Sequence, residues 1–237
     1  MKIPKRLGHI WIGPKRPPQE WMQTWIDRHP DWHYTLYGNE YLASHNFQTK
    51  PQMEEYLRRG WYAGVADLLR YEILYREGGF LAEADSLCLH PIDELLGDGK
   101  ELYTVYENEF VRGKLVSPIV AAAPGHPFLK ELIERLSRIP PADLDRPWKQ
   151  TGNLFVAQLI EELKPDITIW PSYTLIPEHY TGLRYEGPGK IYARQMFGET
   201  NNAYEYVSIM DWLCALRQKL YALRVRKHLR KLRRQRG

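Results

Sequence analysis

The chain has 237 residues, of which 43% are hydrophobic and 26% are charged, and its formal net charge is +4. This length and this balance fit one globular domain, or one domain with a small appendage, and they exclude a disordered chain. The two cysteines, Cys88 and Cys214, argue against a disulfide framework and favour a reducing compartment.

The positive charge is concentrated at the C-terminal end. Ten of the 33 Lys and Arg residues lie at 215–237, where the sequence has no Asp or Glu, so the rest of the chain has 23 basic and 29 acidic residues. Residues 1–6 lack the apolar run of a signal peptide, and no window approaches the roughly 20 apolar residues of a membrane span. We therefore expect a soluble, cytoplasmic protein unless another feature tethers it to a membrane.

Apolar patterning, together with glycine and proline, predicts strands that alternate with helices. The expected strands cover 5–13, 32–37, 80–84, 103–106, 119–123 and 167–170. The expected helices cover 19–28, 62–77, 127–138 and 153–163, and the segment from residue 204 onward is expected to be largely helical. This alternation is typical of an α/β domain with a mostly parallel sheet flanked by helices. We place this single domain at 1–212 and a basic amphipathic C-terminal helix or tail at 213–237.

Two acids, Glu83 and Asp85, follow a short apolar run after Gly78-Gly79. At the carboxyl end of a strand, acids two residues apart can point into one cleft, and this end is where open α/β sheets bind ligands. Mg²⁺ and Mn²⁺ bind one or two carboxylates together with phosphates and water, and such an ion stabilises a diphosphate leaving group. The pattern predicts a metal site for a sugar diphosphate, with two solvated acids as the alternative.

Asp67 and Arg70 lie three residues apart on the preceding helix, so both can project from one face. The acid suits a sugar or ribose hydroxyl, and the guanidinium suits a phosphate or the acid itself. An ordinary intrahelical ion pair is the alternative.

Residues 66–85, ADLLRYEILYREGGFLAEAD, resemble the signature SDxxRYxxLyxyGGiYxDxD of glycosyltransferase family 32. That family includes Golgi initiating mannosyltransferases and bacterial capsular-polysaccharide sugar transferases, and the segment is more remotely similar to large glucosylating toxins. The resemblance continues through residues 88–96, similar to cLxPlDdLl. Individually weaker matches extend it to about 200 residues, namely 3–5 and 9–13 with IPKxIHxiWiG, 122–128 with aapgHPf and 151–153 with TGP.

The resemblance implies a GT-A fold, a Rossmann-like single domain with the acid pair at its ligand-binding edge. It also implies sugar transfer with retention of anomeric configuration and a requirement for Mn²⁺ or Mg²⁺. Trp11 would stack on the nucleobase, although a plain core tryptophan is the alternative for this residue. The implied donor-binding residues are Ile10, Trp11, Asp67, Arg70, Gly79 and Thr200, the metal ligands are Glu83, Asp85 and Thr200, and the catalytic residues are Asp67, Arg70, Glu83 and Asp85.

The sequence departs from the family pattern at two places. Glu83 stands where the family has Asp, one methylene shorter. The family's HHWxxS corresponds by a looser match to residues 195–200, where both histidines and the tryptophan are absent and only Thr200 keeps the hydroxyl. Glu199 is an additional acid in that stretch. These changes leave room for an altered donor or for a degenerate enzyme.

Two histidines have simpler interpretations. His126 lies between Gly125 and Pro127 at an expected helix start, where a capping role is favoured over acid–base chemistry. His9 lies within an expected strand and is interpreted as a core histidine.

The C-terminal segment has leucines near helical spacing among its basic residues. Such a helix can lie on an anionic membrane surface, or pack on the domain with a frayed basic end. Nucleic acid is the least favoured partner of the three.

Taken together, these features predict a retaining, metal-dependent hexosyltransferase that uses a UDP-sugar or GDP-mannose. The acceptor would be a glycan or a lipid-linked acceptor in cell-surface polysaccharide biosynthesis, with the enzyme cytoplasmic or peripheral at the inner face of the plasma membrane. The pattern assigns no carboxylate as nucleophile, so front-face attack by the acceptor is the expected route. The alternatives are a catalytically degenerate nucleotide-sugar binder and a scaffold with a basic tail.

Overall fold

The computed structural model describes residues 3–197 of the chain. Thr200, Glu199, Cys214 and the expected tail at 213–237 lie outside the described residues. Within 3–197, no helix combines the length and the apolar character that a membrane span requires.

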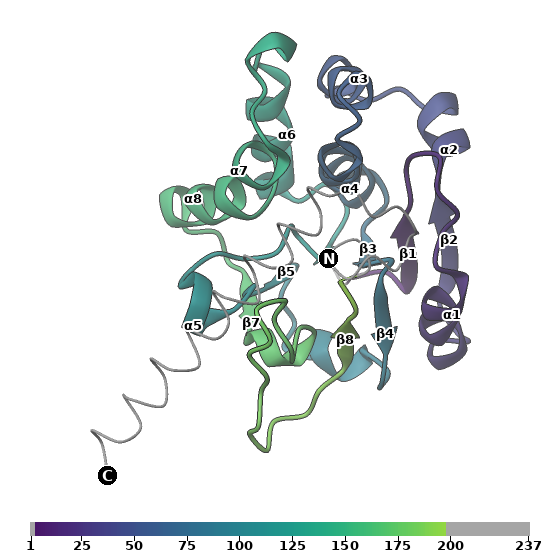
Figure 1. The fold of residues 1–237 in the computed structure, drawn as a ribbon, viewed down its shortest axis with the longest axis vertical. Coiled ribbons are helices and arrows are strands. Elements are labelled where there is room, and N and C mark those ends of the chain that lie inside the picture. Colours follow the sequence, from purple (N-terminus) through teal and green to yellow (C-terminus); the bar gives the residue numbers. More distant parts are fainter. Residues whose placement is uncertain (1–2, 198–237) are drawn as a thin grey trace.

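Short strands and helices alternate through most of the described chain (Figure 1). The strands are β1 Arg6–Ile10, β2 His33–Tyr37, β3 Gly79–Ala82, β4 Ser86–Cys88, β5 Leu102–Val105, β6 Ala121–Ala122, β7 Thr168–Trp170 and β8 Ala193–Gln195. The helices are α1 Gln19–Arg28, α2 Asn39–Ser44, α3 Lys50–Arg58, α4 Tyr62–Glu77, α5 Glu109–Arg112, α6 Pro127–Ser137, α7 Pro147–Gln150 and α8 Asn153–Leu163. Single 3-10 turns cover Asp93–Leu96, Pro141–Asp143 and Ser172–Thr174.

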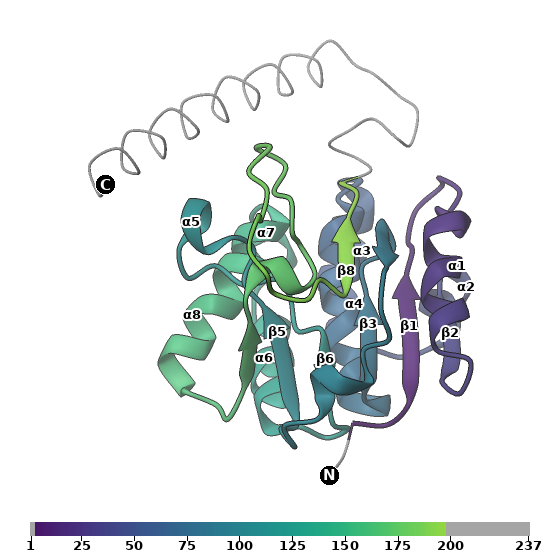
Figure 2. The same cartoon turned by 90° about the horizontal axis from the view of Figure 1, so that it is seen from below.

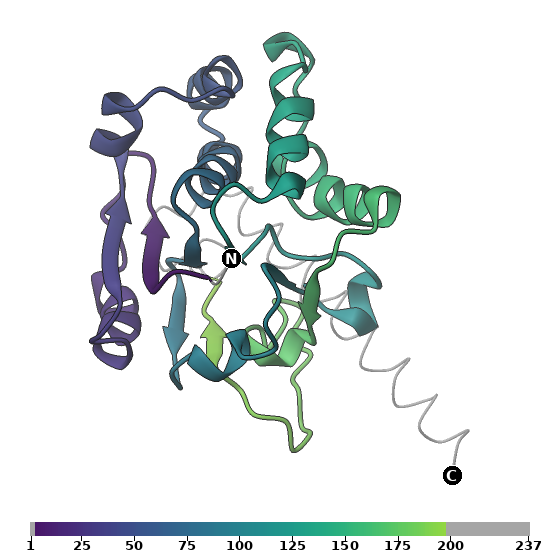
Figure 3. The same cartoon turned by 180° about the vertical axis from the view of Figure 1, so that it is seen from behind.

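The central sheet has the strand order β2-β1-β3-β6-β5-β7, with β2 and β7 at its edges (Figure 3). β1 pairs in parallel with β2 and β3, and β5 pairs in parallel with β7. The two-residue β6 runs antiparallel between β3 and β5, so β3 and β5 point the same way. The carboxyl ends of β1, β3, β5 and β7 therefore share one edge of the sheet (Figure 2). The expected α/β class with a mostly parallel sheet is confirmed.

Both faces of the sheet are covered. Along β3 the side chains alternate, because Leu81 packs into one core while Phe80 and Ala82 pack into the other. Helices α3, α4, α6 and α8 contribute to the first core, and α1 with the two-stranded β4–β8 sheet covers the opposite face (Figure 1). The edge formed by the carboxyl ends remains between these layers, and the loops that follow the strands build the site there.

Helix α4 delivers the chain to β3. The sequence predicted one apolar stripe on this helix, but α4 is buried at every position from Leu68 to Leu74. The helix ends at Gly78, which has a φ of +66°, and Gly79 follows with a φ of +109°. A Cβ atom on Gly79 would lie 2.5 Å from the Arg6 carbonyl oxygen, so only glycine allows β3 to start this close to β1.

Several boundaries differ from the sequence-based prediction. The expected strand at 80–84 ends at Ala82, because the Ser86 amide and hydroxyl both donate to the Glu83 carbonyl and close a turn. The expected strand at 119–123 is reduced to Ala121–Ala122. The sequence analysis did not predict α2, α3, β4 or β8.

Candidate active site

Glu83 and Asp85 lie in the turn that follows β3, and both line one cleft at the carboxyl edge of the sheet. The Ser86 hydroxyl lies 2.7 Å from the Glu83 carbonyl and the Ser86 amide lies 3.2 Å from it, which fixes the turn. The sequence predicted that both acids would face one cleft, and the structure brings them together there.

Arg70 of α4 holds Glu83 in place. Its Nη2 donates to Glu83 Oε1 at 2.7 Å, and its Nη1 donates to the Leu81 carbonyl at 2.6 Å. The Arg70 side chain is only 5% exposed, whereas that of Glu83 is 43% exposed. The guanidinium therefore lies beneath the site and braces Glu83 from the protein side. In the described structure no salt bridge joins Arg70 to Asp67, so the intrahelical pair that was the alternative interpretation is not formed.

Asp67 is bonded to a turn 84 residues away in the sequence. Its Oδ2 accepts from Thr151 Oγ1 at 2.9 Å, and Gly152 packs so closely that a Cβ there would lie 3.0 Å from the same oxygen. Burial raises the Asp67 pKa to about 7, and the Thr151 hydrogen bond and the Arg70 charge oppose this rise. The 151–153 turn is thus part of the site, which the sequence indicated only as a weak match to TGP.

Asp85 lies beside β8. Gln195 Nε2 donates to Asp85 Oδ1 at 2.5 Å, and the Met196 amide donates to the Asp85 carbonyl at 2.8 Å. The segment that begins at Gln195 therefore reaches the acid pair, as the loose match to HHWxxS implied. Thr200 is three residues beyond the described part of the chain, so its expected role stays a prediction.

The cleft has a volume of about 230 Å³ and is mostly apolar. Ile10, the last residue of β1, and Trp11, which follows it, form one wall, and Tyr62 lies in the lining at the first turn of α4. The Trp11 indole donates to the Lys15 carbonyl at 2.7 Å, which keeps the ring at the mouth of the cleft. Sequence reasoning missed Tyr62, because nothing local distinguishes it from a core tyrosine.

Gly79, which the resemblance placed among the donor-binding residues, opens β3 at the end opposite to the turn with the acids. Its contact with Arg6 explains the glycine without any ligand. The structure therefore assigns Gly79 a role in the backbone geometry between α4 and β3, and its expected donor-binding role stays a prediction.

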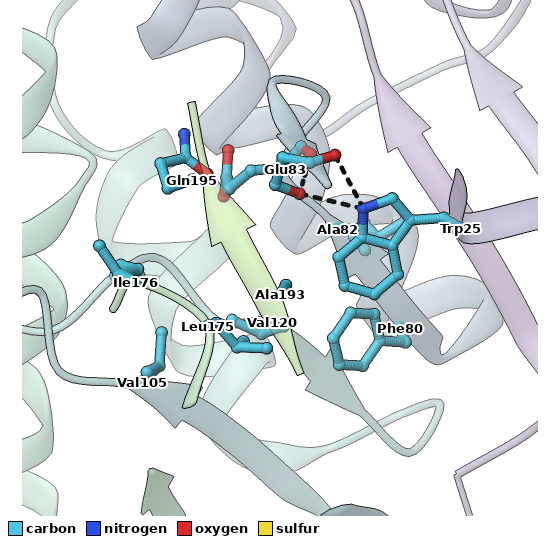
Figure 4. Close-up of a pocket in the computed structure, with 13 residues that line it drawn as sticks. Trp25, Phe80, Ala82, Glu83, Val105, Val120, Leu175, Ile176, Ala193 and Gln195 are labelled. Atoms are coloured by element: carbon cyan, nitrogen blue, oxygen red, sulfur yellow. Dashed lines mark hydrogen bonds between the residues drawn. The ribbon is translucent and has the colours of Figure 1, made fainter. Parts of the chain in front are cut away.

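A second, smaller cavity lies on the other side of Glu83 (Figure 4). Its volume is about 30 Å³, enough for roughly one water molecule, and Phe80, Val120 and Leu175 are among its apolar walls. The Trp25 indole donates to the Ser86 carbonyl and hydroxyl at 3.1 Å, which ties α1 to the turn (Figure 4). This cavity lies among packed side chains next to Glu83, and it is too small for a sugar ring.

The two histidines have structural roles. His126 caps α6, where its Nδ1 accepts from the Phe128 amide at 3.2 Å, so the expected cap is confirmed. His9 is fully buried, and its Nδ1 lies 3.1 Å from the Tyr34 hydroxyl. Burial and the Arg70 charge lower the His9 pKa to about 3, so this histidine is neutral.

The acid pair fits a divalent ion only if a ligand completes the coordination sphere. Residues 3–197 contain no group of three or more Asp, Glu, His or Cys that could hold a metal by itself. Mg²⁺ and Mn²⁺ typically bind through one or two carboxylates plus phosphate oxygens and water. Asp85 and the exposed side of Glu83 match that requirement, with the remaining ligands coming from a diphosphate.

The fold and the site define an α/β protein with a mostly apolar ligand cleft that contains two acids and Trp11 at the carboxyl edge of its sheet. Residues 17–101 match the family model of the glycosyltransferase sugar-binding region containing the DXD motif. The glycosyltransferase structure titled PaToxG Glycosyltransferase has a TM-score of 0.53 and 16% identity, covering 68% of this chain and 70% of that one. This likeness supports the GT-A fold.

Curated relatives agree with this assignment. The chain is 26% identical over 189 residues to inositol phosphoceramide mannosyltransferase 3 of Schizosaccharomyces pombe, covering 75% of this chain and 51% of the relative. It is 27% identical over 143 residues to inositol phosphoceramide mannosyltransferase 2 of the same organism, covering 57% and 39%. The chain thus spans about half the length, or less, of these relatives. The resemblance to glycosyltransferase family 32 is confirmed: residues 17–101 match the sugar-binding region with the DXD motif, and these relatives are mannosyltransferases.

Proposed function

We propose that this protein is a retaining, divalent-metal-dependent transferase that moves a hexose from a nucleotide sugar to an acceptor hydroxyl. The observation that carries the proposal is the placement of Glu83 and Asp85 in one cleft with Trp11, at the edge where α/β sheets bind ligands. Arg70 braces the first acid and Gln195 the second, so both carboxylates are held in place before any ligand arrives.

In this proposal the nucleobase lies against Trp11 and the diphosphate lies over the acids. Asp85 and Glu83 would hold the ion, which supplies Lewis-acid stabilisation of the charge on the departing diphosphate. Asp67 lies one turn of α4 before Arg70, and it would accept a hydrogen bond from a hydroxyl of the ribose or of the donor sugar. Thr151 fixes the Asp67 rotamer through the 2.9 Å hydrogen bond.

Retention of configuration is proposed to follow from attack on the same face as the departing diphosphate. As the acceptor oxygen bonds to the anomeric carbon, the bond from that carbon to the diphosphate oxygen breaks, and the acceptor proton passes to that oxygen. The protein's contribution is to position both partners and to shield them from water.

For the donor and acceptor, the relatives suggest a choice. They are mannosyltransferases of inositol phosphoceramide, a lipid acceptor. We therefore favour GDP-mannose over UDP-sugars as donor and a lipid-linked acceptor over a free glycan. A cytoplasmic position at a membrane surface agrees with the basic residues at 215–237, which suit an anionic leaflet.

A thermal-shift screen of UDP- and GDP-sugars, each with Mn²⁺ and with EDTA, tests the donor. The proposal expects stabilisation by one nucleotide-sugar class in Mn²⁺ only, followed by slow hydrolysis of that donor in the absence of acceptor. Stabilisation without any hydrolysis or transfer would favour the degenerate binder that Glu83 and the missing histidines suggested. No stabilisation by any nucleotide sugar would favour the scaffold.

A further inference from the structure

Across the sheet edge from the acid pair, a second set of polar and aromatic groups gathers around Glu107. This residue follows the carboxyl end of β5, just as Glu83 follows that of β3. Because only β6 separates the two strands, their ends lie about 10 Å apart at strand spacings of about 4.8 Å. A separation of this size leaves room for the donor sugar near Glu83 and for an acceptor ring near Glu107.

Glu107 is held by groups from three other segments. Arg112 Nε of α5 donates to its Oε1 at 3.2 Å, and Asn153 Nδ2 of α8 donates to its Oε2 at 3.1 Å. The third group is His179, from the loop between β7 and β8, whose Nε2 lies 3.5 Å from Oε1. The carboxylate is therefore oriented, yet its side chain keeps 15% of its exposure.

His179 lies behind the carboxylate, on the interior side. Its side chain is fully buried, its Nδ1 lies 2.8 Å from the Thr181 hydroxyl, and its Nε2 faces Glu107. Protein groups therefore surround the interior side of the carboxylate, and the exposed side of Glu107 is the one that a ligand can reach.

Two exposed aromatic side chains lie on the short helices α5 and α7, and one of them is linked to this carboxylate through Arg112. Trp148 of α7 is 41% exposed, and Phe110 of α5 is 76% exposed. The Arg112 guanidinium links Trp148 to Glu107, because its carbon lies 5.8 Å from the Trp148 ring centroid while its Nε donates to the Glu107 carboxylate. A carboxylate held in this way next to an exposed aromatic ring suits a cyclic polyol. The hydroxyls of such a ligand can donate to the acid, and its C–H face can pack on the aromatic ring.

This set is joined to the donor side through one turn. Thr151 bonds Asp67, and Asn153, two residues later, bonds Glu107. Where the family pattern has proline at the third position of TGP, this chain has Asn153, which is able to donate to the acid.

We propose that Glu107, Asn153, His179 and Trp148 form the acceptor subsite and bind a cyclic polyol, either a sugar ring or a cyclitol. This inference rests on the proposed transferase function. It assigns Glu107 to accept hydrogen bonds from the acceptor ring and Trp148 to contact the ring face, while Asn153 and His179 position the carboxylate.

The test uses saturation-transfer NMR on the full chain, with methyl α-D-mannopyranoside and myo-inositol as separate probes. We expect the wild type to saturate at least one probe, and Glu107→Gln and Trp148→Ala each to weaken that binding about fivefold or more, the loss of one net hydrogen bond or contact. A response to the mannoside alone identifies a sugar acceptor, and a response to inositol alone identifies a cyclitol.

Two control variants match the chemistry outside the subsite. Glu131→Gln removes a carboxylate that accepts from the Arg135 Nε at 2.7 Å, and Leu163→Ala removes a side chain that is 40% exposed at the end of α8. Both controls should bind the probes as the wild type does. Because Trp148 is exposed, its variant tests the inference even if Glu107→Gln unfolds, which thermal unfolding would reveal.

If neither probe gives a saturation-transfer signal with the wild type, this inference is overturned. Unchanged binding by folded Glu107→Gln and Trp148→Ala would overturn it as well. Nucleotide binding by the wild type, measured by calorimetry in the same buffer, judges the proposed function separately. Nucleotide binding without probe binding removes only the acceptor subsite, and probe binding without nucleotide binding removes only the donor function.

Discussion

Shortening Glu83 to Asp separates the role of the acid in the site from its role in the ion pair with Arg70. The substitution restores the acid pair that is usual in the family, so we expect transfer or donor hydrolysis to be retained or increased. It also withdraws the carboxylate by about 1.5 Å, one carbon–carbon bond. The 2.7 Å contact with Arg70 would then lengthen to about 4 Å unless the turn moves.

The size of the stability effect follows from the surroundings of the pair. Glu83 is 43% exposed, which keeps the loss near the upper range of surface pairs, about 1 kcal/mol. The Arg70 guanidinium keeps its bond to the Leu81 carbonyl, so the larger loss of a fully unpaired buried charge does not apply. For a chain of this length, about 1 kcal/mol lowers the midpoint of thermal unfolding by roughly 2–4 °C.

The assay combines thermal unfolding with donor hydrolysis at saturating Mn²⁺. Glu131→Asp is the matched control, because it shortens a carboxylate paired with Arg135 on the surface of α6, away from the cleft. A loss of activity beyond about tenfold in a stably folded Glu83→Asp, equivalent to about 1.4 kcal/mol of transition-state stabilisation, would refute the reasoning. The longer arm of Glu83 would then be required for the chemistry.

Three further predictions concern other parts of the chain. Asp85→Ala should abolish turnover with little change in thermal stability, since the acid lies in a turn outside the core; activity that is equal in EDTA and in Mn²⁺ would contradict the metal role. Burial raises the pKa of Asp67 from 3.8 to about 7, so the folded state binds the proton more tightly than the unfolded chain does. The contribution of this residue therefore lowers the free energy of unfolding as the pH rises from about 4 to 7, and the loss persists above pH 7. Asp67→Asn should therefore stabilise the protein more at pH 8 than at pH 5 in urea unfolding, and an equal effect at both values would rule this out. A chain ending at Trp212 should keep donor hydrolysis but lose co-sedimentation with anionic vesicles at low salt, an attraction that also fades at 1 M salt as the Debye length falls to about 3 Å. Equal sedimentation of both forms would eliminate the membrane role, and unfolding of the shortened chain would show that its leucines belong to the core.

Local patterns were enough to place the main helices. The helices at 19–28, 62–77 and 153–163 have the bounds that the sequence predicts, because each has clear apolar spacing and a proline or glycine near its start or end. Helix α3 was missed because most of its residues are polar, and only Gln52, Met53 and Tyr56 are buried. Strands β4 and β8 have three residues each and pair across more than 100 positions, so neither has a local signal.

The candidate site, like the fold, has features that a local motif predicts and features that depend on contacts between distant parts of the chain. The sequence identified Glu83 and Asp85 from a contiguous motif, and the structure places both in one cleft. It could not show that Arg70 binds Glu83 instead of Asp67, because that choice depends on where β3 lies relative to α4. The contacts of Thr151 with Asp67 and of Gln195 with Asp85 span 84 and 110 residues, and only the folded chain reveals them.

Calorimetric titration of GDP and of UDP into the full chain, in Mn²⁺ and in EDTA, tests the central claim most directly. If Glu83 and Asp85 form a metal–diphosphate site, one of the two nucleotides binds in Mn²⁺, binding is lost in EDTA, and Asp85→Ala loses the Mn²⁺ dependence. Binding of equal strength in Mn²⁺ and EDTA, or no binding of either nucleotide by the folded wild type, would contradict the claim.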